Sequence, residues 1–261
     1  MSVTWALLVE YDGTPFVGWQ RQVGGLSVQQ VLEEAASRLA GGQPVATTVA
    51  GRTDAGVHAA GQVAQLALDR PIAAEKLREA LNFHLKPHPV AVLRAAPAPA
   101  GWNARFSAIR RTYRYVILNR RARPALEVGR VWHVHAPLDT EAMHAAAQTL
   151  LGRHDFTSFR ASACQANSPL RTLDRLDVRR AGERIEIVAE ARSFLHHQVR
   201  NMVGTLRLVG EGRWPVARVA AALEARDRGA AGPTAPADGL CLMAVGYPVD
   251  PFAEAADGYA R

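Results

Sequence analysis

The sequence predicts an α+β protein made of two halves, with mainly antiparallel sheets that abut around a central cleft. A chain of 261 residues is long enough for one large domain or two moderate ones. Its composition, 48% apolar and 21% charged, is typical of a globular protein with a core of its own. An Ala-, Pro- and Gly-rich stretch at 96–101 interrupts a pattern of strands and helices that partly recurs after it. We therefore expect halves of residues 1–103 and 104–261.

The first half is expected to follow the order β-α-β-β-α-β, which is the ferredoxin-like pattern. Its first helix is well signalled, because Ser27 and Gln30 have the spacing of a capping box and Gly41 follows the last helical turn. Alternating apolar residues predict the strands, and helical spacing predicts the second helix. The expected strands cover 3–11, 45–51, 61–69 and 89–96, and the second helix covers 74–84.

The second half should partly repeat this order, which suggests a structural duplication. The expected helices lie at 139–151, after Ser193 and at about 215–225. The expected strands lie at 111–118, at 128–135, on both sides of Ala181-Gly182, and over the closing segment LCLMAVGY. Asp139 is the expected cap of the first of these helices. The tail after Pro251 is expected to be a loose end.

The charge is strongly basic and unevenly placed. The formal net charge is +7, and all but two of the 31 basic residues are arginine. Eight arginines stand between Trp102 and Arg130, with Glu127 as the one acid. Such a run is either a solvated basic face or a phosphate-binding surface, and arginine suits the second because its planar fork binds phosphate and stacks on bases.

Membrane and export signals are not expected. No segment approaches 18 uninterrupted apolar residues, and the first residues predict a strand, not a signal peptide. The two cysteines, Cys164 and Cys241, are expected to be reduced and partly buried thiols of a cytoplasmic protein.

The stretch AGRTDAGVHA at 50–59 is the first candidate for chemistry. Its two glycines indicate a turn that would hold Asp54 at a fixed angle toward a cleft. That carboxylate could be a nucleophile, a base, a metal ligand or only a turn-stabilising cap. His58 could share a metal with it. However, His196 and His197 are adjacent on a predicted helix and should point about 100° apart, so no metal site is expected.

Two further positions could face the same cleft. Tyr113 and Tyr115 lie two apart on a predicted strand and should share a face, either as core residues or with one ring stacked on a base. Arg200 interrupts the apolar stripe of a predicted helix and needs a partner, for which Asp54 is one candidate.

Together these segments resemble the tRNA pseudouridine synthase A (TruA) family along nearly the whole chain. GRTDAGVHA is the most specific of the matching stretches. The others are EYDGTPFVGWQRQ, ARFSA, RTYRY, HDFTSFR, FLHHQVRNMVG and DGLCLMAVGYP. One departure is WNARFSA, where many members have a histidine before ARF, and it touches no catalytic position.

The resemblance implies an isomerase that converts uridines 38, 39 and 40 of the tRNA anticodon stem-loop to pseudouridine. It implies that Asp54 is the nucleophilic aspartate, that Tyr113 stacks on the target uracil, that Arg52 helps to extrude the base, and that Arg200 pairs with the aspartate. It also implies a homodimer with tRNA as partner and no cofactor. No metal is expected, and neither DNA nor a membrane is expected as partner.

The residue types suit this reaction. The N-glycosidic bond must break and C5 of the uracil must join the same sugar carbon, in a nucleotide flipped out of its stem. A carboxylate could attack the sugar carbon or remove a sugar proton, and a nearby arginine keeps it ionised. The Tyr113 hydroxyl is a candidate for handling the C5 proton, and Arg110 and Arg111 are candidates for RNA contact.

Two other interpretations remain open from the sequence. One is a relative that acts on other uridines of tRNA or another RNA. The other is a non-catalytic RNA-binding module, against which the intact Asp54, Tyr113 and Arg200 speak.

Overall fold

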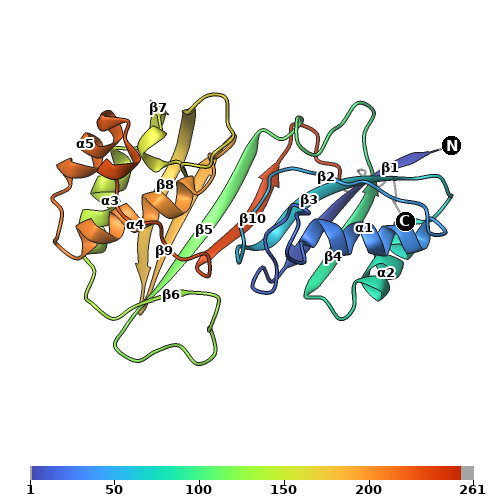
Figure 1. Cartoon of the computed structure of the whole chain (residues 1–261), viewed down its shortest axis with the longest axis horizontal. Coiled ribbons are helices and arrows are strands. Elements are labelled where there is room, and N and C mark those ends of the chain that lie inside the picture. Colours follow the sequence, from blue (N-terminus) through green and yellow to red (C-terminus); the bar gives the residue numbers. More distant parts are fainter. Residues whose placement is uncertain (1, 254–261) are drawn as a thin grey trace, which may run out of the picture.

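The computed structural model describes residues 2–253 and joins their strands into one sheet (Figure 1). This ten-stranded sheet has the order β4-β1-β3-β10-β5-β9-β8-β7, with β2 beside β3 and β6 beside β5. The predicted α+β class with mainly antiparallel pairing is confirmed. The expectation of separate abutting sheets is wrong, because the last strand, drawn in red, lies between the strands of the two halves and pairs with both.

In the first half the predicted element order is observed. The elements are β1 Val3–Tyr11, α1 Val28–Leu39, β2 Thr48–Val49, β3 His58–Leu68, α2 Ala74–Leu85 and β4 Val90–Pro97. Ser27 caps α1 as predicted, since its hydroxyl accepts the Gln30 backbone N–H. The strand expected at 45–51 shrinks to two residues, because the backbone N–H and hydroxyl of Thr47 both donate to Glu33 of α1.

The second half begins with β5 Arg110–Asn119, β6 Trp132–Val134, α3 Thr140–Gln148 and β7 Gly152–Asp155. It continues with η1 Thr157–Phe159, β8 Leu170–Ala181, β9 Arg184–Ala191, α4 Gln198–Gly210, α5 Ala217–Ala225, η2 Arg228–Ala230 and β10 Leu240–Gly246. Asp139 caps α3 as predicted. Strand β7 and the two short 3₁₀ helices were not predicted, and the strand expected at 128–135 is reduced to β6.

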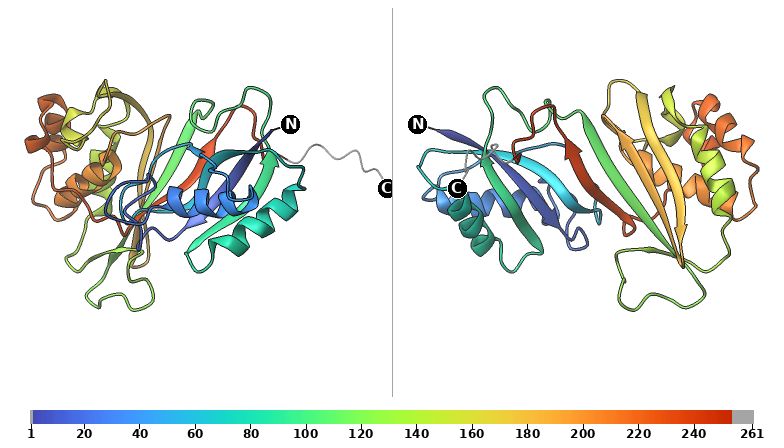
Figure 2. Two further views of the ribbon diagram at one scale, coloured as in Figure 1. Left: turned by 45° about the vertical axis from the view of Figure 1, so that its right-hand side comes forward. Right: turned by 180° about the vertical axis from the view of Figure 1, so that it is seen from behind.

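The helices cover the sheet in two groups (Figure 2). Helices α1 and α2 lie over the strands of the first half, and α3, α4 and α5 lie over those of the second. Alternate residues of β1 divide between two clusters: Leu7 joins the main core, whereas Ala6 packs in a smaller one with Trp102 and Phe252. Phe252 is only 7% exposed. The prediction of a loose end from Pro251 onward is therefore wrong up to residue 253, and its remainder lies outside the described residues.

Two observations on residues 2–253 concern the cysteines and the helices. Cys164 and Cys241 are free thiols, each partly buried. None of the helices in that range combines the length and the apolar run needed to cross a bilayer.

Arg111 has a structural role, which corrects its assignment as a candidate RNA contact. The residue is 7% exposed on β5. Its guanidinium donates to four backbone carbonyls, those of Ala50, Arg105, Ala108 and Arg192. The side chain thereby ties the start of the 50–59 stretch to the second half, and burial lowers its pKa from the ordinary value.

We expect Arg111→Ala to destabilise the protein by about 3–5 kcal/mol, because it leaves several buried carbonyls without a donor at roughly 1–3 kcal/mol each. The neighbouring Arg110 is exposed, so Arg110→Ala should change the free energy of unfolding by less than about 0.5 kcal/mol. Urea unfolding of the two variants makes the comparison. Equal stability of both would contradict the structural role of Arg111.

Candidate active site

The loop at 50–57 connects β2 to β3 and is anchored to the strands below it. The hydroxyls of Tyr11 and Thr53 share a hydrogen bond of 2.8 Å. Gln62 on β3 donates to the Gly51 carbonyl at 2.8 Å and to the Tyr11 hydroxyl at 3.2 Å. Tyr11, Thr53 and Gln62 are all buried, so the two contacts to Thr53 and Gly51 fix the position of the loop on the sheet.

One of the two glycines that predicted the turn is needed for its backbone shape. Gly56 has a φ of +76°, in the left-handed region that other residues rarely adopt, whereas Gly51 has no such conformation. A third glycine, Gly18, has a φ of +111°, and a Cβ there would lie 2.8 Å from the Thr53 carbonyl oxygen. The turn that carries Asp54 thus depends on glycine within the loop and beside it.

The Asp54 carboxylate lies among three basic side chains. Arg200 Nη1 is 3.4 Å from Oδ2, His196 Nε2 is 3.4 Å from Oδ1, and His197 Nε2 is 3.5 Å from Oδ2. Arg200 also donates through Nε to the Ala235 carbonyl at 2.8 Å, which fixes its guanidinium. The structure therefore brings together the predicted partners Asp54 and Arg200, with no carboxylate other than Asp54 in the cluster as described.

His196 and His197 lie beside Asp54, a position that the sequence reasoning did not predict. They do not lie on a helix, because α4 begins at Gln198 and His197 precedes it with a left-handed φ of 62°. That turn brings the two rings to 4.0 Å between centroids, both beside Asp54. A left-handed non-glycine residue stores strain and is most common at functional sites. Burial lowers the pKa of His197, against the opposing pull of Asp54.

The same cluster could in principle hold a metal ion. Asp54, His196 and His197 offer three ligand atoms that all lie within 4.8 Å of one another. Imidazole nitrogens and a carboxylate oxygen are ligands that zinc accepts. The Arg200 guanidinium, however, is already on the same carboxylate and repels a second cation. The arrangement favours a carboxylate paired with a fixed protein cation over one that holds a metal ion.

His58 takes no part in this cluster. Its Nδ1 accepts the Gly13 backbone N–H at 3.0 Å, and its Nε2 lies 2.8 Å from the Gly129 carbonyl oxygen. The Nδ1 atom also lies 3.2 Å from Asp12 Oδ1, so both ring nitrogens already have partners away from Asp54. The interpretation of His58 as a metal partner of Asp54 is therefore wrong, and its ring instead holds two loops together.

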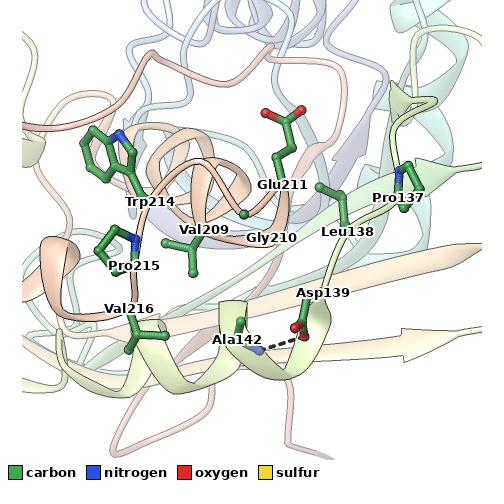
Figure 3. A pocket seen from close by; sticks show the side chains of 11 residues that line it. Pro137, Leu138, Asp139, Ala142, Val209, Gly210, Glu211, Trp214, Pro215 and Val216 are labelled. Atoms are coloured by element: carbon green, nitrogen blue, oxygen red, sulfur yellow. Dashed lines mark hydrogen bonds between the residues drawn. The ribbon is translucent and has the colours of Figure 1, made fainter.

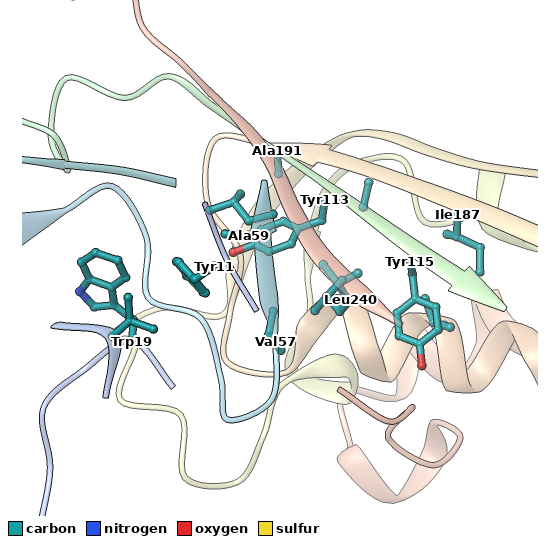
Figure 4. Close-up of a cluster of buried hydrophobic side chains, with 14 of the residues drawn as sticks. Tyr11, Trp19, Val57, Ala59, Tyr113, Tyr115, Ile187, Ala191 and Leu240 are labelled. Carbon is teal, nitrogen blue, oxygen red and sulfur yellow. The ribbon is translucent and has the colours of Figure 1, made fainter. Parts of the chain in front are cut away.

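Tyr113 and Tyr115 share a face of β5, as predicted, but differ in surroundings (Figure 4). Tyr115 is a core residue whose hydroxyl donates to the Pro236 carbonyl. Tyr113 is 8% exposed and meets the Phe194 ring edge-on at 5.3 Å. Burial, and then the nearby acidic groups of Tyr11 and Asp54, raise the pKa of Tyr113. Its phenol is therefore neutral at physiological pH, and it lies near Asp54.

Arg52 lies on the outer side of the loop, two residues from Asp54. Its side chain is exposed, and within residues 2–253 it makes no ion pair. The structure therefore does not join Arg52 to Asp54, and leaves its guanidinium available to an outside partner.

One hollow of the described structure lies away from Asp54. It is about 620 Å³ and sits between α3 and the segment after α4, with Leu138, Val209 and Trp214 in its lining (Figure 3). None of its lining residues belongs to the Asp54 cluster. The Asp54 side chain itself is 22% exposed, so it can be reached from solvent.

A carboxylate held by a guanidinium and two imidazoles, near a buried phenol, is the kind of charged cluster found at enzyme active sites. A family model described as "tRNA pseudouridine synthase" matches residues 7–107 and 146–248. Asp54 and Arg200 lie inside the matched segments, and Tyr113 lies between them.

Close relatives carry the same description. The chain is 75% identical over 249 residues to "tRNA pseudouridine synthase A" of Acidiphilium cryptum, covering 95% of this chain and 98% of the relative. It is 63% identical to the protein of that name in Rhodospirillum centenum, over 93% and 99% of the two chains. In Gluconobacter oxydans the identity is 59%, over 95% and 91%. The chain belongs to the tRNA pseudouridine synthase family, a family of isomerases that act on tRNA.

The pairing of Asp54 with Arg200 can be measured as a coupling energy. Their side chains are 22% and 15% exposed at 3.4 Å, so we expect about 1 kcal/mol, near the surface-pair range and well below the 3–5 kcal/mol for breaking a buried pair. A double-mutant cycle with Asp54→Asn and Arg200→Gln, followed by denaturant unfolding, gives the value. The matched cycle of Asp54→Asn with Arg38→Gln, on α1, should be additive. Additivity in both cycles would exclude a pairing of Asp54 with Arg200.

Proposed function

We propose that the protein isomerises uridines 38, 39 and 40 in the anticodon stem-loop of tRNA to pseudouridine, without a cofactor. The observation that carries this proposal is the geometry around Asp54, whose carboxylate is the only acid of its cluster in the described structure and faces Arg200 at 3.4 Å. Family membership supplies the reaction, and the geometry supports Asp54 as the group that performs it.

In the proposed reaction the Asp54 carboxylate acts on the sugar of the target uridine. As a nucleophile it would form a bond to C1′ while the bond from C1′ to N1 breaks and the electron pair leaves with the uracil. The freed uracil turns, C5 forms the new bond to C1′, the carboxylate leaves, and the C5 proton is lost. As a base it would instead take a sugar proton. In either course Arg200, His196 and His197 hold the carboxylate oriented.

Two residues would handle the base. A uridine inside a stem must be flipped out to reach Asp54, and the exposed Arg52 is placed on the outer side of the loop to occupy the space that it leaves. Tyr113 would stack on the uracil, with Phe194 packed edge-on behind the tyrosine ring. Because burial raises the pKa of Tyr113, its hydroxyl would act as a neutral phenol and not as a preformed phenolate base.

The remaining proposals concern the setting of the site. Residues 1–103 would supply the catalytic loop, and residues 104–261 would supply Tyr113 and Arg200 as a second unit. The exposed arginines of the 102–130 segment would lie along the tRNA backbone, and the enzyme would work as a cytoplasmic homodimer. The exposed members of that set are Arg105, Arg110, Arg121, Arg123 and Arg130.

Asp54→Asn should abolish pseudouridine formation, with a loss of at least about 10³-fold in turnover, because the amide is not nucleophilic and carries no charge. The dissociation constant for tRNA should stay within about threefold of wild type. Release of tritium from tRNA labelled at C5 of uridine measures turnover. A matched transcript with cytidine at 38, 39 and 40 should release none with wild-type enzyme. Release from that transcript would refute the proposed positions, and activity of Asp54→Asn would refute the proposed nucleophile.

Tyr113→Phe and Tyr113→Leu separate the ring from the hydroxyl. If the ring holds the uracil, the Leu variant should lose about 1–3 kcal/mol of stacking. If the hydroxyl handles the C5 proton, the Phe variant should bind tRNA normally but fail to complete the product. Filter binding and tritium release on both variants separate the two roles. Full activity of the Phe variant would eliminate proton transfer by Tyr113, and full activity of both would eliminate any role in the reaction.

A further inference from the structure

A second hollow lies where β8 begins and β9 ends, and its lining is rich in phosphate-binding groups. It is about 310 Å³. Its lining contains three arginines, three hydroxyl side chains and no carboxylate. The lining residues are Arg153, Ser168, Leu170, Arg171, Thr172, Arg192 and Ser193. Arginine forks and hydroxyls are the donors that bind phosphate oxygens in proteins.

Arg171 is held in this pocket with an unused donor. Its Nη1 donates to the carbonyls of Ser168 at 3.0 Å and Leu170 at 2.6 Å, which fixes the guanidinium. Its Nε is buried and has no hydrogen-bond partner anywhere in residues 2–253. A buried donor without a partner costs roughly 1–3 kcal/mol of free energy. A ligand oxygen that accepts from this Nε would remove that cost.

The other two arginines of the pocket likewise have no carboxylate partner in the described chain. Arg153 on β7 lies directly opposite Thr172 on β8, and Arg192 follows the end of β9. Neither makes an ion pair with any carboxylate of the described chain. Arg175, farther along β8, does have carboxylate partners, because it pairs with Asp177 at 2.7 Å and with Glu190 at 3.4 Å. The pocket is therefore a local concentration of uncompensated positive charge.

The pocket lies close in sequence to the residues around Asp54. Ser193 is next in sequence to Phe194, which packs on Tyr113. It precedes His196 by three residues, so the two Cα atoms lie within about 11 Å of each other. That reach corresponds to one or two nucleotides of an RNA strand that has its target base beside Asp54.

We propose that this pocket binds a backbone phosphate of the tRNA close to the flipped uridine. The proposal rests on the proposed function for the identity of the RNA, and on Arg153, Arg171 and Arg192 for the site. Its role is to position the strand, because a phosphate contact fixes register without reading sequence.

The double variant Arg153→Ala/Arg192→Ala tests the pocket, since both side chains are exposed and neither supports the core. We expect the dissociation constant for tRNA to rise about tenfold or more, and the slope of log affinity against log salt to become shallower by about 1. The control Arg38→Ala/Arg179→Ala removes the same charge from exposed positions. It should raise the dissociation constant for tRNA less than threefold. Ser193→Ala, which changes no charge, should also weaken binding measurably.

Equal losses of tRNA affinity in the pocket and control variants would overturn the proposal, because they would show that only the overall positive charge of the protein attracts tRNA. Unchanged tRNA affinity of the pocket variant would overturn it as well. Inorganic phosphate at constant ionic strength is the second probe: binding that depends on Arg153 and Arg192 without any loss of tRNA affinity would indicate a site for free phosphate and contradict the RNA assignment. These experiments measure binding and not turnover. If the wild-type protein does not isomerise uridine, that result counts against the proposed function, and the binding results still test the pocket.

Discussion

The pairing of β10 with both β3 and β5 is the constraint on which the site depends. Cys241 and Leu242 of β10 pair in parallel with His58 and Ala59 at the start of β3, immediately after the loop that carries Asp54. On its other side β10 runs antiparallel to β5, where Leu242 lies opposite Tyr113. A short stretch of one strand therefore sets the Asp54 loop against the strand that carries the neighbouring tyrosine.

The charges around Asp54 depend on the same arrangement. The carboxylate comes from the first half of the chain, and its three basic neighbours come from residues 196–200 of the second. The buried guanidinium of Arg111 donates hydrogen bonds to the Ala50 carbonyl, before Asp54, and to the Arg192 carbonyl, before His196. Each half alone would hold an incomplete cluster. The joined sheet assembles it before any substrate arrives, which is what preorganised catalysis requires.

Local sequence patterns predicted the local structure, but they did not predict which strands pair with one another. The cap at Ser27 predicted α1, because capping follows from short-range chemistry. The need of Arg200 for a partner left Asp54, 146 residues away, as only one candidate, and the family resemblance supplied the pairing. The place of β10 between the halves could not be predicted, since strand pairing across the chain leaves no local pattern. Helical periodicity through 194–197 hid the left-handed turn at His197. A run of arginines likewise could not distinguish Arg111, which bonds carbonyls, from its exposed neighbours.

Hydrogen exchange along β10 tests the central claim most directly, namely that the joined sheet holds the site together in the free protein. The account predicts that the amides of β10, and those at the start of β3 that pair with it, exchange as slowly as those of β5 and β9 without RNA, because they share one continuous ladder. Mass spectrometry of peptides from 57–60 and 240–246 measures this. Rapid exchange in both peptides, with protection only after tRNA is added, would contradict a preassembled site.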